Sequence, residues 1–139
     1  MNAELLLKLA SLTHVGLIAA GLLMPRVTGL WADAEKLSPF ARGLFRTYYA
    51  FIGLCLVSFG AGSWFLAREL ASGTILARAA CWFLAAFWLI RLLAAIWILD
   101  VSPYLRTGWH RLGYHATNVV FGTLPFLYAW VAVRAVPAG

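Results

Sequence analysis

Five polar side chains lie inside long apolar stretches of this chain, and their types could bind a ligand or a cofactor. They are His14, Tyr49, Arg91, His115 and Asn118. An imidazole can ligate a metal or transfer a proton, and a guanidinium binds anions. A phenol and an amide form hydrogen bonds with polar head groups. Polar and ionisable groups inside apolar segments are costly in lipid and usually face a bundle interior or a cavity, so they are the first place to look for function.

Four apolar stretches must position these side chains, and each is long enough to form a transmembrane helix. They cover residues 4–24, 40–67, 73–99 and 109–136. A helix needs about 20 residues to cross a hydrocarbon core of about 30 Å. Charged residues make up only 12% of the chain, against about 25% in soluble domains. We therefore expect one transmembrane domain over residues 1–139, an all-α, integral membrane antiparallel four-helix bundle.

Proline and serine mark the ends of these stretches. Pro25 predicts the end of the first helix, because proline cannot continue a helix interior. Ser38 followed by Pro39 predicts an N-cap and the first helical position of the second helix. The break at residues 71–73 is short, so we expect the second and third helices to be neighbours.

The charges indicate an orientation in the membrane. The connections at residues 25–39 and 101–108 lie on one face, which we call the loop-rich face, and the termini lie on the other. Apart from Arg91, six of the eleven Lys and Arg lie near the loop-rich face, Arg106 among them, and four near the other. This excess favours a cytoplasmic loop-rich face with both termini outside. No basic run with interleaved aromatic residues occurs, so we expect no nucleic-acid partner.

The rise of a helix places the five polar side chains at similar depths below the loop-rich face. At 1.5 Å per residue, His14 and Asn118 lie about 15 Å deep and Arg91 about 14 Å. Tyr49 lies about 13 Å deep and His115 about 10 Å. These depths predict that His14, Arg91, His115 and Tyr49 approach one another in the loop-rich half of the bundle.

Arg91 carries the sharpest prediction, because arginine stays protonated in proteins and a buried charge needs a partner. None of the five acidic residues falls inside a stretch at its depth. The partner is therefore a loop carboxylate, another subunit or a bound anion, unless the guanidinium snorkels to the surface over backbone carbonyls. Trp88 shares its helical face and could flank the guanidinium.

Three segments carry a resemblance to a known group of proteins. They are residues 36–39 leading into Arg42 and Phe45, residues 76–81 leading through Phe87 and Trp88 to Arg91, and residues 111–115. Together they resemble small bacterial four-span membrane proteins of unassigned function. The resemblance implies the four-span fold, in a bacterial inner membrane, and it supplies no site residues.

Two functions remain open. The first is an accessory or subunit-type module whose polar half-bundle holds an anionic or polar-headed amphiphile, a lipid or a quinone-like molecule, or contacts a partner subunit or a second copy. The second is a b-type haem-binding membrane anchor of a redox complex, with His14 and His115 as axial ligands. An enzyme is not favoured, because Ser-His-Asp, HExxH and glycine-rich phosphate-loop patterns are absent from the sequence.

Overall fold

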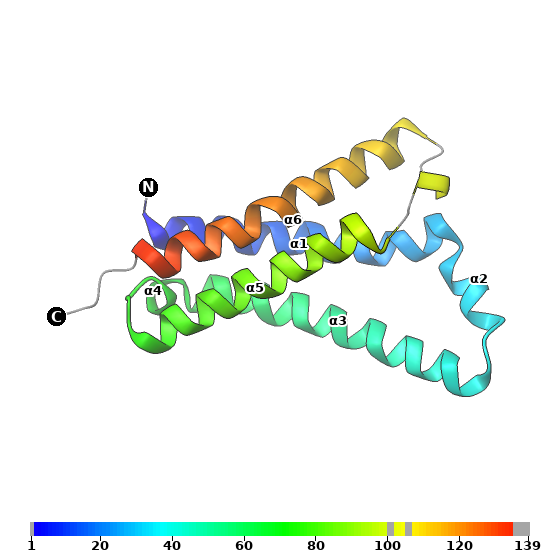
Figure 1. The fold of residues 1–139 in the computed structure, drawn as a ribbon, viewed down its shortest axis with the longest axis horizontal. Helices are drawn as coiled ribbons and strands as arrows, with labels where there is room; N and C mark the ends of the chain where they lie inside the picture. The colour runs from blue at the N-terminus through cyan, green and yellow to red at the C-terminus, as the bar shows by residue number, and fades with distance from the viewer. Residues whose placement is uncertain (1, 100–101, 105–106, 135–139) are drawn as a thin grey trace.

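Four long helices dominate the structure, a computed structural model that describes residues 2–99, 102–104 and 107–134. They are α1 (Ala3–Thr28), α3 (Pro39–Phe65), α5 (Ile75–Trp97) and α6 (Gly108–Arg134). The connections contain α2 (Leu30–Glu35), α4 (Ala67–Leu70) and the 3-10 turn η1 (Ser102–Tyr104) (Figure 1). Arg106 and the predicted end of the last stretch at residue 136 lie outside the described residues.

Each of the four long helices is long and apolar enough to cross a membrane. The described residues contain helices and no strand. The protein is therefore an all-α, integral membrane four-helix bundle, as the sequence predicts. The start of α1, the end of α6 and α4 lie at one end of the elongated molecule, whereas α2 and η1 lie at the other (Figure 1). We call these the termini end and the loop-rich end.

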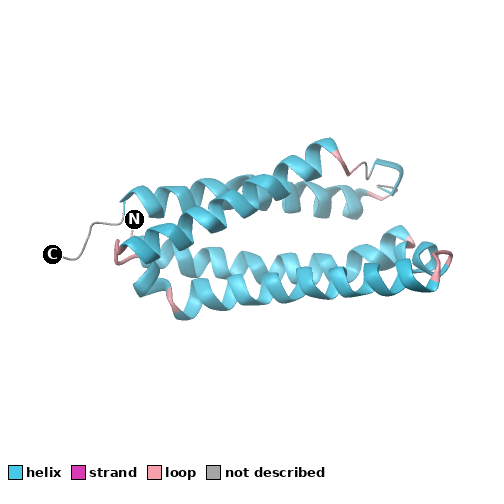
Figure 2. Ribbon diagram, turned by 60° about the horizontal axis from the view of Figure 1, so that its bottom comes forward, coloured by secondary structure: helices cyan, strands magenta, loops and turns pink. Residues whose placement is uncertain are grey.

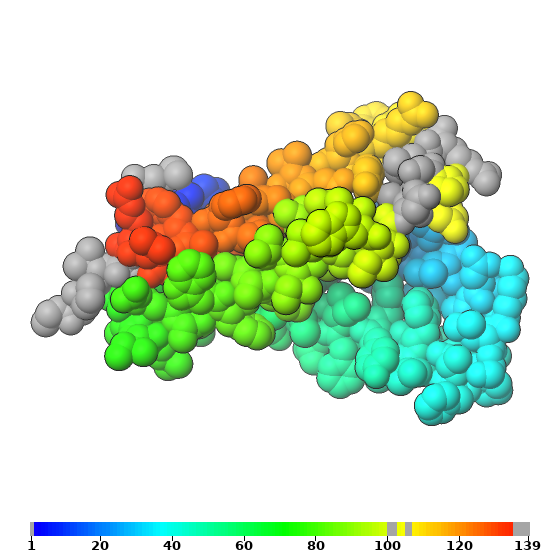
Figure 3. All heavy atoms as spheres, in the orientation of Figure 1, coloured from blue at the N-terminus to red at the C-terminus, as the bar shows by residue number. Residues whose placement is uncertain are grey.

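The four helices form two pairs. α1 packs along α3, and α5 packs along α6, with α1 also touching α6. Figure 2 shows the two pairs as two layers, and Figure 3 shows α5 and α6 side by side along one face. The expected close contact of the second and third helices is weak, because the chain between them forms α4 before it turns. The ring of Phe59 does reach α5, with its centroid 4.9 Å from that of Phe87 and 6.2 Å from that of Phe83.

The packed core is concentrated in the half of the bundle nearer the termini. Its largest fully buried side chains include Trp88, Tyr128, Leu7, Leu124 and His14. α6 has no buried residue before Phe121, and α3 buries only Gly60 and Ser63. Most side chains of α3 and of the first half of α6 are therefore left to contact lipid or another molecule.

The helix starts follow the rules of capping. The Ser38 hydroxyl accepts a hydrogen bond from the Ala41 amide at 3.3 Å, and Pro39 is the first residue of α3. This confirms the predicted N-cap. Thr74 caps α5 in the same way, accepting from the Ala77 amide at 3.2 Å. Each cap satisfies a backbone donor that has no partner within its helix.

The prediction that the first helix ends at Pro25 was wrong, since α1 continues to Thr28 and is capped by Gly29 with a left-handed φ of 72°. Proline removes one N–H, and the carbonyl that loses its donor is that of Gly21, four residues earlier. The Tyr49 hydroxyl of α3 donates a hydrogen bond to this carbonyl. The helix can therefore pass through Pro25, because a side chain from its neighbour replaces the missing donor.

Tyr49→Phe should lower the free energy of unfolding by about 1–3 kcal/mol, because it leaves the Gly21 carbonyl without that donor. Pro25→Ala restores a backbone N–H, so Tyr49→Phe should cost much less in a Pro25→Ala background. The measurement is a double-mutant cycle on unfolding in mixed micelles. Tyr48→Phe is the matched control, because Tyr48 is the exposed neighbour of Tyr49. Equal costs in both backgrounds would contradict this role of Tyr49.

Candidate functional site

His14 is fully buried where α1 meets α3 and α5. Its Nδ1–H donates to the Ala10 carbonyl at 2.7 Å, an assignment that follows because a carbonyl can only accept. On the α3 side, a Cβ added at Gly60 would lie only 3.0 Å from the Cβ of His14. The Nε2 atom is buried and has no hydrogen-bond partner among the described residues. His14 is therefore a tightly packed residue with one nitrogen still able to accept.

A chain of rings connects His14 with Arg91. The His14 ring meets Trp88 edge to face with centroids 5.2 Å apart. Trp88 in turn stacks on Phe121 of α6, at 5.7 Å. The guanidinium of Arg91 lies 4.8 Å above the centre of the Phe121 ring. The ring that flanks Arg91 is thus Phe121, not the Trp88 ring that the sequence suggested.

Arg91 is half-buried in α5 and forms no ion pair with a carboxylate among the described residues. The face of an aromatic ring attracts the cation, but it can accept hydrogen bonds from few of the five N–H groups of the guanidinium. Because α5 ends at Trp97, Arg91 lies about 9 Å from the loop-rich end of its helix, closer than predicted. His14 lies deeper than predicted, about 21 Å from the end of α1, because that helix continues past Pro25.

The other three predicted residues lie apart from this chain of rings. Tyr49 is half-buried and packs on Trp31, with centroids 5.2 Å apart, while its hydroxyl binds the Gly21 carbonyl. His115 is exposed, and its ring contact is with its neighbour Tyr114. Asn118 is half-buried.

The expected meeting of all four side chains is not observed, since no hydrogen bond or ring contact among the described residues joins Tyr49 or His115 to His14. The haem hypothesis needs the imidazoles of both histidines at one iron, whereas one is fully buried against Trp88 and the other is exposed. Separately from haem, which needs only two axial ligands, the described residues hold no group of three His, Cys, Asp or Glu side chains able to bind a metal ion. Binding roles for the five residues stay predictions.

Ion pairs organise the loop-rich surface. Glu35 of α2 binds Arg42 at 2.6 Å and also binds Arg46, so it ties α2 to the first turns of α3. Asp33 pairs with Lys36 at 2.7 Å. This hydrogen bond raises the pKa of Lys36 above its ordinary value. A lysine is already protonated at neutral pH, and the bond to Asp33 strengthens that preference.

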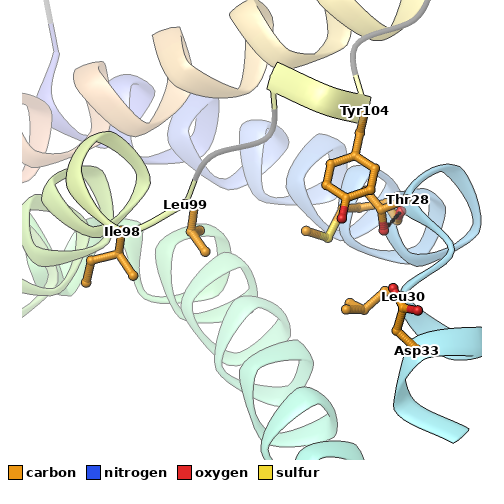
Figure 4. A pocket seen from close by; sticks show the side chains of 7 residues that line it. Thr28, Leu30, Asp33, Ile98, Leu99 and Tyr104 are labelled. Atoms are coloured by element: carbon orange, nitrogen blue, oxygen red, sulfur yellow. Dashed lines mark hydrogen bonds between the residues drawn. The ribbon is translucent and has the colours of Figure 1, made fainter. Parts of the chain in front are cut away.

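An open pocket of about 240 Å³ lies beside these ion pairs, between the ends of α1 and α5, α2 and η1. Figure 4 shows Ile98 and Leu99 on one side and Thr28, Leu30, Asp33 and Tyr104 on the other. Met24 completes the lining. Ligand pockets for whole small molecules are about 300–1,000 Å³, so this one suits a head group rather than an entire amphiphile.

Sequence reasoning missed a polar contact in the termini half. The hydroxyls of Ser63 and Tyr128 lie 2.6 Å apart and are both almost completely buried. The available signal was a tyrosine within the apolar stretch of the last helix, because a buried phenol usually finds a hydrogen-bond partner. This contact joins α3 to α6 and is structural.

Comparison of the chain with protein-family models, with curated proteins and with solved structures found no match.

Gly60→Ala should destabilise the bundle relative to Gly53→Ala by about 1–3 kcal/mol. A methyl group at Gly60 presses on the buried His14, whereas one at Gly53 meets nothing within 4 Å. Both variants gain the same helix propensity, so the difference isolates the packing at His14. Thermal unfolding in detergent measures it. Equal stabilities would show that α1 and α3 are not in contact at Gly60.

Proposed function

We propose that this protein is a small accessory module of a bacterial inner membrane that holds an anionic or polar-headed amphiphile, a lipid or a quinone-like molecule, in its loop-rich half. The observation that carries the proposal is Arg91. Its guanidinium lies within a transmembrane helix over the ring of Phe121, without an ion-pair partner among the described residues.

The energetics of Arg91 favour a bound anion or a strong hydrogen-bond acceptor. A charge removed from water is costly unless it is paired, and in lipid the alternatives are few. A phosphate oxygen or a quinone carbonyl can accept hydrogen bonds from the N–H groups that do not contact the Phe121 ring. Arg91 lies about 9 Å along the helix from the loop-rich end of α5. An amphiphile with its head at the interface could therefore reach the guanidinium.

The packing of the loop-rich half supports the same proposal. The buried residues of α6 begin at Phe121 and those of α3 at Gly60. An amphiphile tail can therefore lie against helix faces that the protein itself does not cover. A partner subunit is the second candidate, because α3 exposes large apolar side chains along its length. These include Phe40, Phe51, Ile52, Leu54 and Val57.

Arg91→Leu should lower the amount of amphiphile that co-purifies with the protein at least about tenfold. This is the effect expected for the loss of one charged hydrogen bond. The fold should persist, because leucine is favoured over arginine in a span by about 3 kcal/mol. Arg134→Leu is the matched control. Arg134 also lies over an aromatic ring, that of Trp130 at 5.7 Å, but at the termini end. Native mass spectrometry of protein extracted with its lipids measures the bound components.

Loss of a polypeptide instead of a lipid in Arg91→Leu would favour the partner subunit. Full retention of every component would contradict both candidates. The absorption spectrum of the same preparation tests the haem alternative, which requires a Soret band that disappears in His14→Leu. We expect no such band, because His115 is exposed while His14 is buried.

A further inference from the structure

The pocket at the loop-rich end has a polar side and an apolar side. Thr28, Asp33 and Tyr104 provide the polar atoms, and the apolar wall includes Ile98 and Leu99 (Figure 4). It lies where the ends of the helices meet the interfacial connections, which is the depth of lipid head groups and the first carbons of their tails. A head group with a short apolar neck matches this division.

The polar side consists mainly of hydrogen-bond acceptors. The Thr28 hydroxyl already donates to the Met24 carbonyl at 2.9 Å, so toward the pocket it can only accept. Asp33 accepts from Lys36 through Oδ1, and no described residue donates to its Oδ2. The Tyr104 phenol can accept as well. No Lys, Arg or His belongs to the described lining. A ligand for this wall must bring donors and must not be anionic at that point.

We propose that this pocket binds the primary ammonium head of a membrane phospholipid, of the ethanolamine type. An ammonium carries three N–H donors and a positive charge, which match the Thr28, Asp33 and Tyr104 oxygens. A quaternary choline head has no N–H to donate, and the Asp33 carboxylate repels a glycerol phosphate head. The site is separate from Arg91, which takes an anionic or accepting group.

Lys36 is the competitor for the Asp33 carboxylate. Its side chain is 76% exposed, so the pair is screened by water and contributes little. A carboxylate has about four acceptor positions, and Lys36 uses one oxygen. The two ammonium groups can therefore share Asp33, and removing Lys36 should strengthen the binding of the lipid.

The test uses the full-length protein in neutral detergent with equal amounts of phosphatidylethanolamine and phosphatidylcholine of identical acyl chains. Native mass spectrometry counts each lipid retained. The wild-type protein should retain about fivefold more of the ethanolamine lipid, the size expected for a partly exposed charged hydrogen bond. Asp33→Asn should abolish this preference. Glu69→Gln, which removes one exposed acid at the termini end, should leave it unchanged.

Lys36→Gln separates lipid binding from a structural role of the ion pair. If Asp33 binds the lipid ammonium, Lys36→Gln should preserve or raise the preference. If Asp33 serves only to hold Lys36, both variants should lose it equally, and the proposal is overturned. Equal retention of the two lipids by the wild-type protein overturns it as well.

Tyr104→Phe should lower the preference without changing the ion pair between Asp33 and Lys36. It provides an independent answer should Asp33→Asn fold poorly. Both lipids carry the same phosphate, so their ratio reports the ammonium site, whereas the Arg91 test counts the total amphiphile bound, and the two tests can fail separately.

Discussion

Backbone groups inside lipid have no water to bind, so each needs a partner within the protein. Pro25 lacks an N–H, and the loop-rich half depends on the contact that replaces this donor. The Tyr49 hydroxyl binds the Gly21 carbonyl and thereby allows α1 to continue to Thr28. The same kind of bond recurs along the helix pairs. Ser11 donates to the Gly60 carbonyl at 2.7 Å between α1 and α3, and Arg78 donates to the Ala132 carbonyl at 3.0 Å between α5 and α6. Hydrogen bonds from side chains to backbone carbonyls therefore join the helices of both pairs. In lipid, apolar contact alone gives a helix little preference for another helix over the lipid tails.

This arrangement divides the bundle into two halves with different roles. In the termini half, Leu7, Leu124 and Tyr128 are fully buried, and the Tyr128 hydroxyl is paired with that of Ser63. The loop-rich half carries Arg91, the pocket and the interfacial ion pairs, and its helices bury few residues. A stable, closed half can support an open one because the four helices are continuous through both. The proposed ligand would lie in this open half.

The four spans, the membrane location and the N-cap at Ser38 could be predicted from the sequence, because they depend on composition and on local backbone chemistry. The end of α1 could not, since the helix passes Pro25 only with a donor from Tyr49, which lies 24 positions away in the chain. A depth count also assumes known helix ends. With α1 longer and α5 shorter than expected, His14 and Arg91 moved in opposite directions.

The facing of side chains was the other feature beyond the reach of the sequence. A helical stripe suggested that His115 and Asn118 point inward, but His115 is exposed and Asn118 is only half-buried. Which helices pair was also not encoded locally, since the short turn after α3 joins helices that touch mainly through Phe59. Arg91 could be singled out from the sequence, because that step needs only the positions of the acidic residues in the chain.

The most direct test of a bound amphiphile at Arg91 is photo-crosslinking from the ring that the guanidinium covers. Benzoylphenylalanine at Phe121 should capture, in vesicles of mixed lipids, one anionic or quinone-type species far above its share of the bilayer. The same probe at Phe126, which is 72% exposed on α6, should capture lipids in the proportions of the bilayer. Identical adducts at the two positions would contradict the account, because Arg91 would then face only ordinary lipid.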